Sequence, residues 1–250
     1  MSTRAELRQS GEGMRQSLFG DDDGAPAIMR TVNDEAAYAA VWSRPGLALQ
    51  DRMICALAAL GGVQRLRKLR RHVAAALDLG LSPRSIVEVF IQVGIYAGFA
   101  ASEEAIEAAG TVFADRGIAM PQETAREDSL EALSERGRDL MQQLHGDRAT
   151  QGYAAPDNAV AGALYPLAIQ YGYGEIWFRP GLDFRQRALV AVAAFTALKL
   201  DSQVAKFSQS ALNMGLSRTE VIEAVIQTAP LSGFAPALNA LGGLNAAFGD

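Results

Sequence analysis

The sequence contains one stretch twice, and this duplication constrains the fold more than any other feature. Trp42-Ser-Arg-Pro-Gly-Leu47 recurs 135 residues later as Trp177-Phe-Arg-Pro-Gly-Leu182. From there residues 42–105 align with 177–240 without a gap, and 21 of the 64 pairs are identical. Ahead of the motif the offset changes to 126, which pairs Phe19-Gly-Asp21 with His145-Gly-Asp147. A match of this length indicates two copies of one structural module.

Each copy is predicted to be helical, because its apolar share comes mainly from Ala and Leu, which lose little freedom in a helix. The Arg-Pro-Gly string interrupts the helical pattern, because the residue before a proline disfavours the helical conformation and glycine permits a turn. A first helix is expected at about 49–60 and 184–198, and a second at about 65–79, ending at Gly80. The third begins at the Ser82-Pro83 cap in repeat 1 and at the capping box Ser217-Arg-Thr-Glu220 in repeat 2.

These patterns predict an all-α fold built from a duplicated helical module, with the two pseudo-symmetric repeats packed together like a covalently linked dimer. The predicted domains are repeat 1 at 1–120 and repeat 2 at 129–250. The polar segment 121–128 between them is interpreted as a linker.

Composition excludes several classes of function. A net charge of −5 and a pI near 5.2 argue against a nucleic-acid partner, which needs a basic face. A single cysteine, Cys55, cannot form an internal disulfide or a CxxC pair and is interpreted as a small buried hydrophobe. With no membrane-spanning run and no leader, a cytoplasmic location is expected. The two histidines, His72 and His145, lie too far apart in the sequence to indicate a metal site.

Three stretches together resemble the carboxymuconolactone decarboxylase family. They are Tyr171-Gly-Tyr-Gly-Glu-Ile-Trp-Phe-Arg-Pro-Gly-Leu182, Arg70-Arg-His-Val-Ala-Ala-Ala-Leu-Asp-Leu-Gly80 and Glu88-Val-Phe-Ile-Gln-Val-Gly-Ile-Tyr-Ala-Gly98. The resemblance implies an all-α fold shared with alkylhydroperoxidase AhpD-like proteins. It also implies a homo-oligomer, either a trimer of tandem chains or a dimer.

The peroxidase branch of this group carries C-x-x-C-x-x-H on the second helix. The corresponding residues here are Leu66, Leu69 and His72 in repeat 1, and Asp201, Val204 and Phe207 in repeat 2. Because no thiol pair is present, we expect no dithiol peroxidase activity.

The decarboxylase branch keeps a Glu in the G-E-x-W motif and a His on the second helix, and this chain divides the two residues between its repeats. Repeat 1 has His72 but Ala40 at the Glu position, whereas repeat 2 has Glu175 but Phe207 at the His position. One interpretation is that both sites decayed. The other is that His72 and Glu175 complete one catalytic site between the repeats. His72 would move a proton near neutral pH, and Glu175 would act as an acid in an aromatic wall.

The candidate substrate-binding residues are arginines and aromatic residues near the motifs. A guanidinium group suits a carboxylate ligand, although matched arginines in both repeats also suit ion pairs that support the fold. Tyr96 has no counterpart in repeat 2, where Leu231 stands, which makes it a pocket candidate. Trp177 is a further candidate that could equally anchor the core, and His145 is assigned to the surface or to packing. The predicted substrate-binding set is Arg44, Arg52, Tyr96, Trp177 and Arg179.

The resulting prediction is a lyase or isomerase that needs no cofactor and no metal. It would act on a small lactone or unsaturated carboxylate, in secondary metabolism or aromatic degradation, by decarboxylase-like proton transfer. The alternative is a non-catalytic protein on the same fold that binds a small ligand or supports an assembly. A small molecule is the expected partner, and neither a nucleic acid nor a membrane is expected.

Overall fold

The computed structural model describes residues 3–21, 23–123, 126–152, 155 and 158–249, and every regular element among them is helical. This confirms the predicted all-α fold. Repeat 1 contains α1 (Arg4–Phe19), η1 (Ala27–Met29), α2 (Arg30–Val32), η2 (Asn33–Trp42), α3 (Leu49–Gly62), α4 (Leu66–Asp78), α5 (Pro83–Ala97) and α6 (Phe99–Asp115). Repeat 2 contains α7 (Leu130–His145), η3 (Gly146–Thr150), α8 (Tyr165–Leu167), η5 (Ala168–Glu175), η6 (Ile176–Phe178), α9 (Phe184–Ala197), α10 (Asp201–Asn213), α11 (Arg218–Ser232) and α12 (Phe234–Phe248).

The three helices predicted for each repeat are α3–α5 and α9–α11, and where the sequence predicted both ends of a helix they agree with the structure within two residues. Ser82 caps α5 by accepting a hydrogen bond from the Ser85 backbone N–H at 3.0 Å. Ser217 and Glu220 form the predicted capping box at the start of α11. Capping and apolar spacing therefore located these helices correctly, because both are local properties of the sequence.

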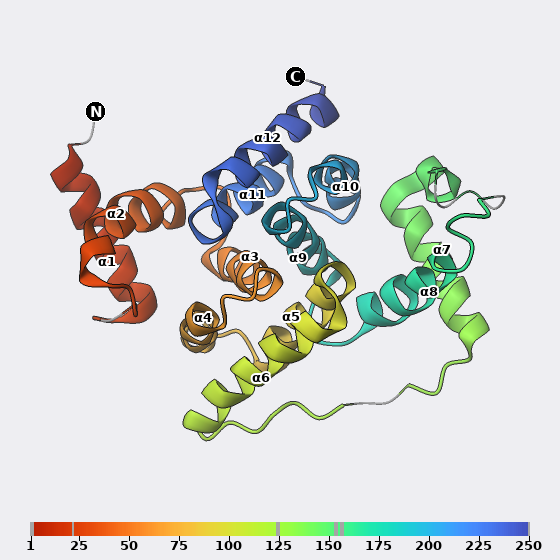
Figure 1. Ribbon diagram of the computed structural model, residues 1–250, viewed down its shortest axis with the longest axis horizontal. Helices are drawn as coiled ribbons and strands as arrows, with labels where there is room; N and C mark the ends of the chain where they lie inside the picture. Colours follow the sequence, from red (N-terminus) through yellow and green to blue (C-terminus); the bar gives the residue numbers. More distant parts are fainter. Residues whose placement is uncertain (1–2, 22, 124–125, 153–154, 156–157, 250) are drawn as a thin grey trace.

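A lead-in hairpin precedes these helices in each repeat, and the sequence analysis did not predict it. In repeat 1, α1 packs on the π-helix η2, and in repeat 2, α7 packs on the π-helix η5 (Figure 1). Gly11 lies against the backbone of Asp34, and Gly137 lies against the backbone of Ile169, with no room for a Cβ at either glycine. The two hairpins are thus built alike, with an offset of 126 between α1 and α7 and of 135 between η2 and η5.

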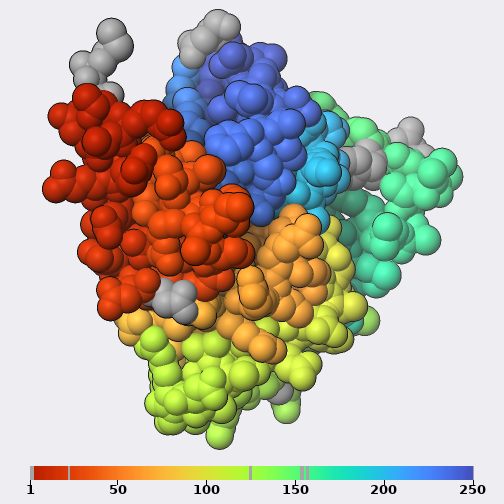
Figure 2. All heavy atoms as spheres, turned by 60° about the vertical axis from the view of Figure 1, so that its left-hand side comes forward, coloured from red at the N-terminus to blue at the C-terminus, as the bar shows by residue number. Residues whose placement is uncertain are grey.

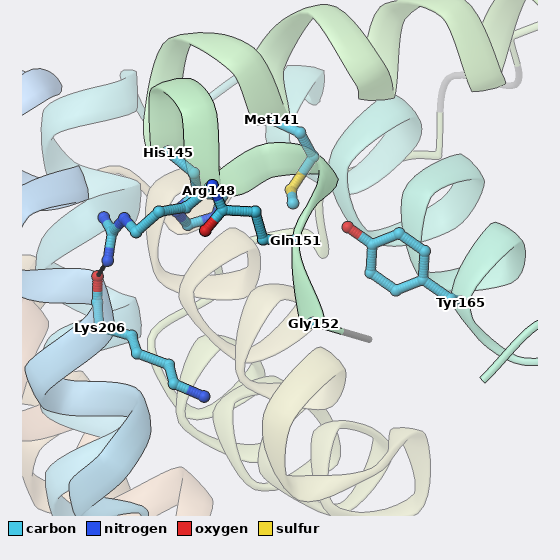
Figure 3. Close-up of a pocket in the computed structure, with 7 residues that line it drawn as sticks. All are labelled: Met141, His145, Arg148, Gln151, Gly152, Tyr165 and Lys206. Carbon is cyan, nitrogen blue, oxygen red and sulfur yellow. Dashed lines mark hydrogen bonds between the residues drawn. The ribbon is translucent and has the colours of Figure 1, made fainter. Parts of the chain in front are cut away.

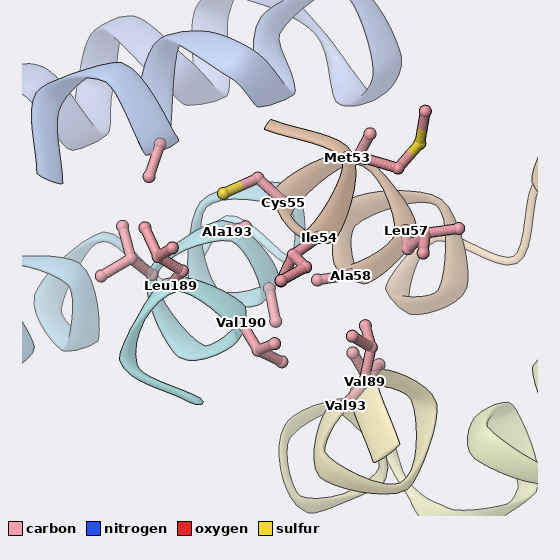
Figure 4. Packing of buried hydrophobic residues seen from close by; sticks show 14 of the residues in the cluster. Met53, Ile54, Cys55, Leu57, Ala58, Val89, Val93, Leu189, Val190 and Ala193 are labelled. Carbon is pink, nitrogen blue, oxygen red and sulfur yellow. The ribbon is translucent and has the colours of Figure 1, made fainter. Parts of the chain in front are cut away.

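The centre of the molecule is a single hydrophobic core to which both repeats contribute. Helices α3 and α9 pack against each other, and α5 packs on both of them. Figure 4 shows Ile54, Leu57, Val89 and Val190 within this core, all at most 1 % exposed. The predicted packing of two repeats is confirmed. The limits 1–120, 121–128 and 129–250 stay a prediction, since the repeats share one core.

Part of the first lead-in hairpin meets the opposite repeat. In Figure 2 the N-terminal hairpin lies beside the C-terminal helices, and η2 contacts α11. The segment between α6 and α7 runs along the outside of the molecule, and its described residues form no helix (Figure 1). Because this segment lies outside the core, it does not prevent the helices of the two repeats from packing against each other.

Reciprocal ion pairs join the repeats. In one, Arg44 and Arg52 of repeat 1 hold Glu223 of α11, with N···O distances of 2.7 and 2.8 Å. In the other, Arg179 and Arg187 of repeat 2 hold Glu88 of α5 at 3.1 and 3.3 Å.

Each ion pair is extended by a glutamine one helical turn further along. The Arg52 guanidinium donates to Gln227 at 3.2 Å, and the Arg187 guanidinium donates to Gln92 at 3.0 Å. Arg52 and Arg187 are at most 1 % exposed, so these charges depend on their partners for compensation.

The Arg-Pro-Gly turns bring the outer arginines to these carboxylates. Gly46 and Gly181 have φ values of +92° and +111°, a region that favours glycine. A Cβ on Gly46 would lie 2.8 Å from Thr219 of α11, and one on Gly181 would lie 2.6 Å from Arg84 of α5. Each turn is therefore pressed against the third helix of the other repeat, which explains why Arg-Pro-Gly is present in both copies.

We expect Glu223→Gln and Glu88→Gln each to lower the free energy of unfolding by about 3 kcal/mol, because each leaves a buried guanidinium without a carboxylate. Asp78→Asn is the matched control. It breaks the Asp78–Arg116 pair, whose Asp78 side chain is 62 % exposed, and should cost less than about 1 kcal/mol. Urea unfolding of the three variants measures the difference. Equal losses at all three positions would contradict the structural role assigned to the buried pairs.

Candidate active site

In each repeat an imidazole ring contacts a phenyl ring at the same two matched positions. The position that holds the histidine in one repeat holds the phenylalanine in the other. In repeat 1, Phe19 of α1 contacts His72 of α4 with ring centroids 4.9 Å apart. In repeat 2, His145 of α7 contacts Phe207 of α10 at 5.7 Å. Each repeat therefore has one imidazole in its aromatic cluster, and in repeat 2 it comes from the lead-in hairpin instead of the second module helix.

His72 lies inside the protein and is only 1 % exposed. Its Nδ1 lies 3.0 Å from the backbone carbonyl of Lys68, and because a carbonyl only accepts, Nδ1 must carry the proton in this hydrogen bond. Phe19 and Trp42 cover the ring. Burial in this cluster lowers the pKa of His72 from its usual 6.5 to about 3, so the ring is neutral at pH 7.

His145 lies nearer the surface and has a polar partner that repeat 1 lacks. Its Nδ1 is 2.6 Å from the Ser210 hydroxyl of α10. The residues aligned with His145 and Ser210 are Phe19 and Ala75, so an apolar pair in repeat 1 corresponds to a hydrogen-bonded pair in repeat 2. Burial, followed by the charge of Arg148, lowers the pKa of His145 to about 4.

A cavity of about 270 Å³ opens beside His145. Figure 3 shows its lining, which comes from α7, the following η3 segment, α8 and α10. Among the described residues that line it, two are cationic and none is acidic: the set is Met141, His145, Arg148, Gln151, Gly152, Tyr165 and Lys206. Arg148 is held in place by donating to the backbone carbonyl of Lys206 at 2.9 Å. Such a lining attracts a small anion and places it next to an imidazole.

Glu175 lies on a different pocket, of about 440 Å³, between the repeats. Its carboxylate is 3.7 Å from the Arg179 guanidinium, which also pairs with Glu88 and Glu123. The remaining lining consists of Ile91, Phe99, Tyr171 and Ile176. The structure thus brings together two of the predicted site residues, Glu175 and Arg179, in a mostly apolar pocket whose cation is shared among carboxylates.

The structure does not bring His72 and Glu175 together within the described chain. His72 contacts Lys68, Phe19 and Trp42 of its own repeat. Glu175 contacts Arg126 and Arg179, and no described pocket is lined by both residues. A catalytic pair formed by these two side chains stays a prediction without geometric support in one chain.

The other predicted residues are divided between the core and the ion pairs. Tyr96 and Trp177 do lie together, since the Tyr96 hydroxyl interacts with Gln92 and with the Trp177 side chain. Burial raises the pKa of Tyr96 to about 12, so it stays protonated at neutral pH. Arg44 and Arg52 are both engaged by Glu223, and neither lines a described pocket. Substrate binding by these residues stays a prediction.

Arg148, Tyr165 and Lys206 were not among the residues predicted from the sequence, and His145 was predicted to lie at the surface or to serve packing. A signal for His145 was present, because the repeat alignment pairs it with Phe19 and pairs His72 with Phe207. Contact between these positions could not be inferred without the lead-in hairpin. No signal marked Arg148 or Tyr165, which meet His145 only through the fold of repeat 2.

Three further findings concern metals, membranes and the cysteine. The described residues contain no group of three or more His, Cys, Asp or Glu side chains placed to hold a metal ion. No described helix is long and apolar enough to cross a membrane. Cys55 is fully buried in the core, and burial raises the pKa of its thiol (Figure 4).

The low pKa of His72 makes stability depend on pH. Unfolded His72 binds a proton below about pH 6.5, whereas the folded ring stays neutral down to about pH 3. Stability should therefore fall on acidification across this window, with His72 contributing up to about 1.4 kcal/mol per pH unit. His72→Phe, which installs the residue found at position 207, should remove this contribution. Unfolding curves between pH 7 and 4 measure it, and an unchanged slope would show that His72 is not buried in its neutral form.

A family model described as the carboxymuconolactone decarboxylase family matches the chain twice, over residues 26–110 and 163–246. The 4-carboxymuconolactone decarboxylase of Acinetobacter baylyi is 37 % identical over 83 residues, which are 33 % of this chain and 62 % of that protein. The nitrosuccinic acid decarboxylase of Metarhizium robertsii is 29 % identical over 75 residues, which are 30 % of this chain and 52 % of that protein.

Each match covers less than two thirds of the relative concerned. The two segments of the family model, by contrast, lie one in each repeat and together span more than half of the chain. Both contain the Arg-Pro-Gly turn and the three helices that build the shared core. This protein therefore belongs to the carboxymuconolactone decarboxylase family.

Proposed function

We propose that this chain is a decarboxylase-like lyase that acts on a small carboxylate in the cavity beside His145. The observation that carries the proposal is the lining of this cavity, where two cations and an imidazole meet with no acidic side chain among the described lining residues. Membership of a family with relatives named as decarboxylases supports the reaction type. The substrate class is that of the sequence-based prediction, a lactone acid or an unsaturated carboxylate.

In the proposed reaction Arg148 and Lys206 hold the anionic substrate. The bond between the carboxyl carbon and its neighbour breaks, carbon dioxide leaves, and the electron pair is delocalised as an enolate. Protonated His145 then delivers a proton to carbon, and solvent restores it, so that each turnover consumes one proton. Burial and the charge of Arg148 hold the His145 pKa near 4. A bound anion raises it, because a nearby negative charge favours the imidazolium form.

Ser210 orients the imidazole in this scheme. Its hydroxyl fixes Nδ1 at 2.6 Å, so the ring presents its other nitrogen away from α10. Ser210 itself is fully buried and is a positioning residue. The composite pair His72 and Glu175 has no part in this scheme, although the pocket of Glu175 and Arg179 is the competing location for the reaction.

The proposal also includes a homo-oligomer. Large apolar side chains are exposed at matched positions of the two repeats, as Phe99 and Phe234 are at 59 % and 57 %. Val32 and Leu167 form a second matched pair, at 54 % and 49 %. Exposure retained in both copies supports a contact surface used by both repeats.

The proposed site is tested by carbon dioxide release from 4-carboxymuconolactone and from nitrosuccinate. The double variant His145→Phe/Ser210→Ala copies the apolar pair of repeat 1 and should fold. We expect it to reduce turnover by about 100-fold or more, the usual contribution of a general acid. Lys206→Met should weaken substrate binding. Glu175→Gln is the matched control in the competing pocket and should change turnover little.

Loss of turnover in Glu175→Gln, with turnover kept in the double variant His145→Phe/Ser210→Ala, would contradict the proposal. It would place the reaction in the pocket of Glu175 and Arg179. Binding of either compound without release of carbon dioxide by the unmodified chain would instead support the alternative of a non-catalytic ligand-binding protein. Thermal shifts with both compounds distinguish binding from turnover.

A further inference from the structure

Asp23 is a buried carboxylate in repeat 1 at the place that corresponds to the open cavity of repeat 2. It is fully shielded from solvent. Its Oδ2 accepts a hydrogen bond from the Tyr38 hydroxyl at 2.6 Å, and its Oδ1 accepts one from the Ala25 backbone at 3.0 Å. Lys68 Nζ lies 3.5 Å from Oδ2, and Arg30 Nη1 lies 3.7 Å from Oδ1.

These contacts form a complete recognition set for one carboxylate. A phenol, a backbone N–H, an ammonium and a guanidinium group surround the two oxygens. Desolvation opposes ionisation of Asp23, but these donors and charges outweigh it and lower the pKa of the carboxyl group. Arg30 Nη1 is buried and has no hydrogen-bond partner among the described residues, so its interaction with Asp23 is electrostatic.

The alignment of the repeats relates this niche to the cavity beside His145. At the offset of 135, which holds from α2 and α8 onward, Arg30 and Arg71 of repeat 1 match Tyr165 and Lys206, which line the cavity. Phe19 packs on Tyr38, which Asp23 contacts, and it matches His145.

At the offset of 126, no carboxylate corresponds to Asp23 among the described residues of repeat 2. The lead-in offset of 126 that pairs Phe19 with His145 places Ala149 opposite Asp23. Ala149 carries no charge, and repeat 2 has an open cavity lined by Arg148 and Lys206.

We infer that the niche around Tyr38 is a carboxylate-binding site which repeat 1 fills with its own Asp23, and that a free carboxylate takes the corresponding place in repeat 2. The second half of this inference rests on the proposed function and names the group that the cavity recognises. The first half depends only on the contacts of Asp23. Repeat 1 is thus closed to substrate by an internal ligand, whereas repeat 2 is open.

The test is rescue of Asp23→Ala by formate. The substitution leaves Tyr38, Lys68 and Arg30 around an empty space, so the variant should unfold at a lower temperature than the unmodified chain. Formate should raise its Tm by several degrees along a saturating curve, because it binds the folded state only. Sodium chloride at equal ionic strength should not. Asp23→Asn fills the same space and should show no such gain.

Asp78→Ala is the matched control. It also removes a carboxylate that pairs with an arginine, Arg116 at 2.6 Å, but at the protein surface, and formate should not affect it. An Asp23→Ala variant that folds and responds equally to formate and chloride would overturn the inference. If the variant does not fold in chloride, refolding in formate gives the answer. Recovery only in formate supports the site, and recovery in neither salt contradicts it.

This result is independent of the proposed reaction. Rescue of Asp23→Ala without any turnover by the unmodified chain would leave the niche established and remove the lyase proposal. Turnover that depends on His145, without rescue of Asp23→Ala by formate, would support the lyase proposal and contradict the niche.

Discussion

Two glutamates, Glu88 and Glu223, carry the interaction on which the rest of the structure depends. Each accepts two guanidinium groups from the opposite repeat, and the inner guanidinium of each pair is buried. Buried charges cannot remain unpaired without a large cost, so neither repeat can leave the other. The Arg-Pro-Gly turns position the outer arginines, Arg44 and Arg179, beside these carboxylates. This reciprocity explains why arginine, glutamate and glutamine survive in both copies while so much else has diverged.

With the interface fixed by these pairs, the periphery of each repeat was free to change. The lead-in hairpins show the result, since Phe19 and Ala75 in repeat 1 correspond to His145 and Ser210 in repeat 2. The buried pair Arg15–Asp34 of repeat 1 likewise corresponds to two apolar residues in repeat 2. A scaffold held by symmetric contacts can thus support two unlike cavities, one closed by Asp23 and one open.

The sequence was sufficient for the parts of the fold that depend on local pattern. Helical spacing and the caps at Ser82 and Ser217 located three helices in each repeat, and the offset of 135 revealed the pairing of the repeats. The π-helices were missed because no residue pattern distinguishes them from α-helices. The composite pair of His72 and Glu175 was inferred from complementary losses, and among the described residues of one chain no contact joins the two side chains. The place of His145 beside a cavity could not be predicted, because it depends on the contact between α7 and α10.

The central claim is that one repeat is closed by its own carboxylate and the other is open to a free one. Calorimetric titration with formate tests it most directly, because it counts sites without assuming a reaction. The account predicts one site per chain in the unmodified protein, abolished by Lys206→Met, and two sites per chain in Asp23→Ala. The same number of sites in the unmodified chain and in folded Asp23→Ala would contradict it.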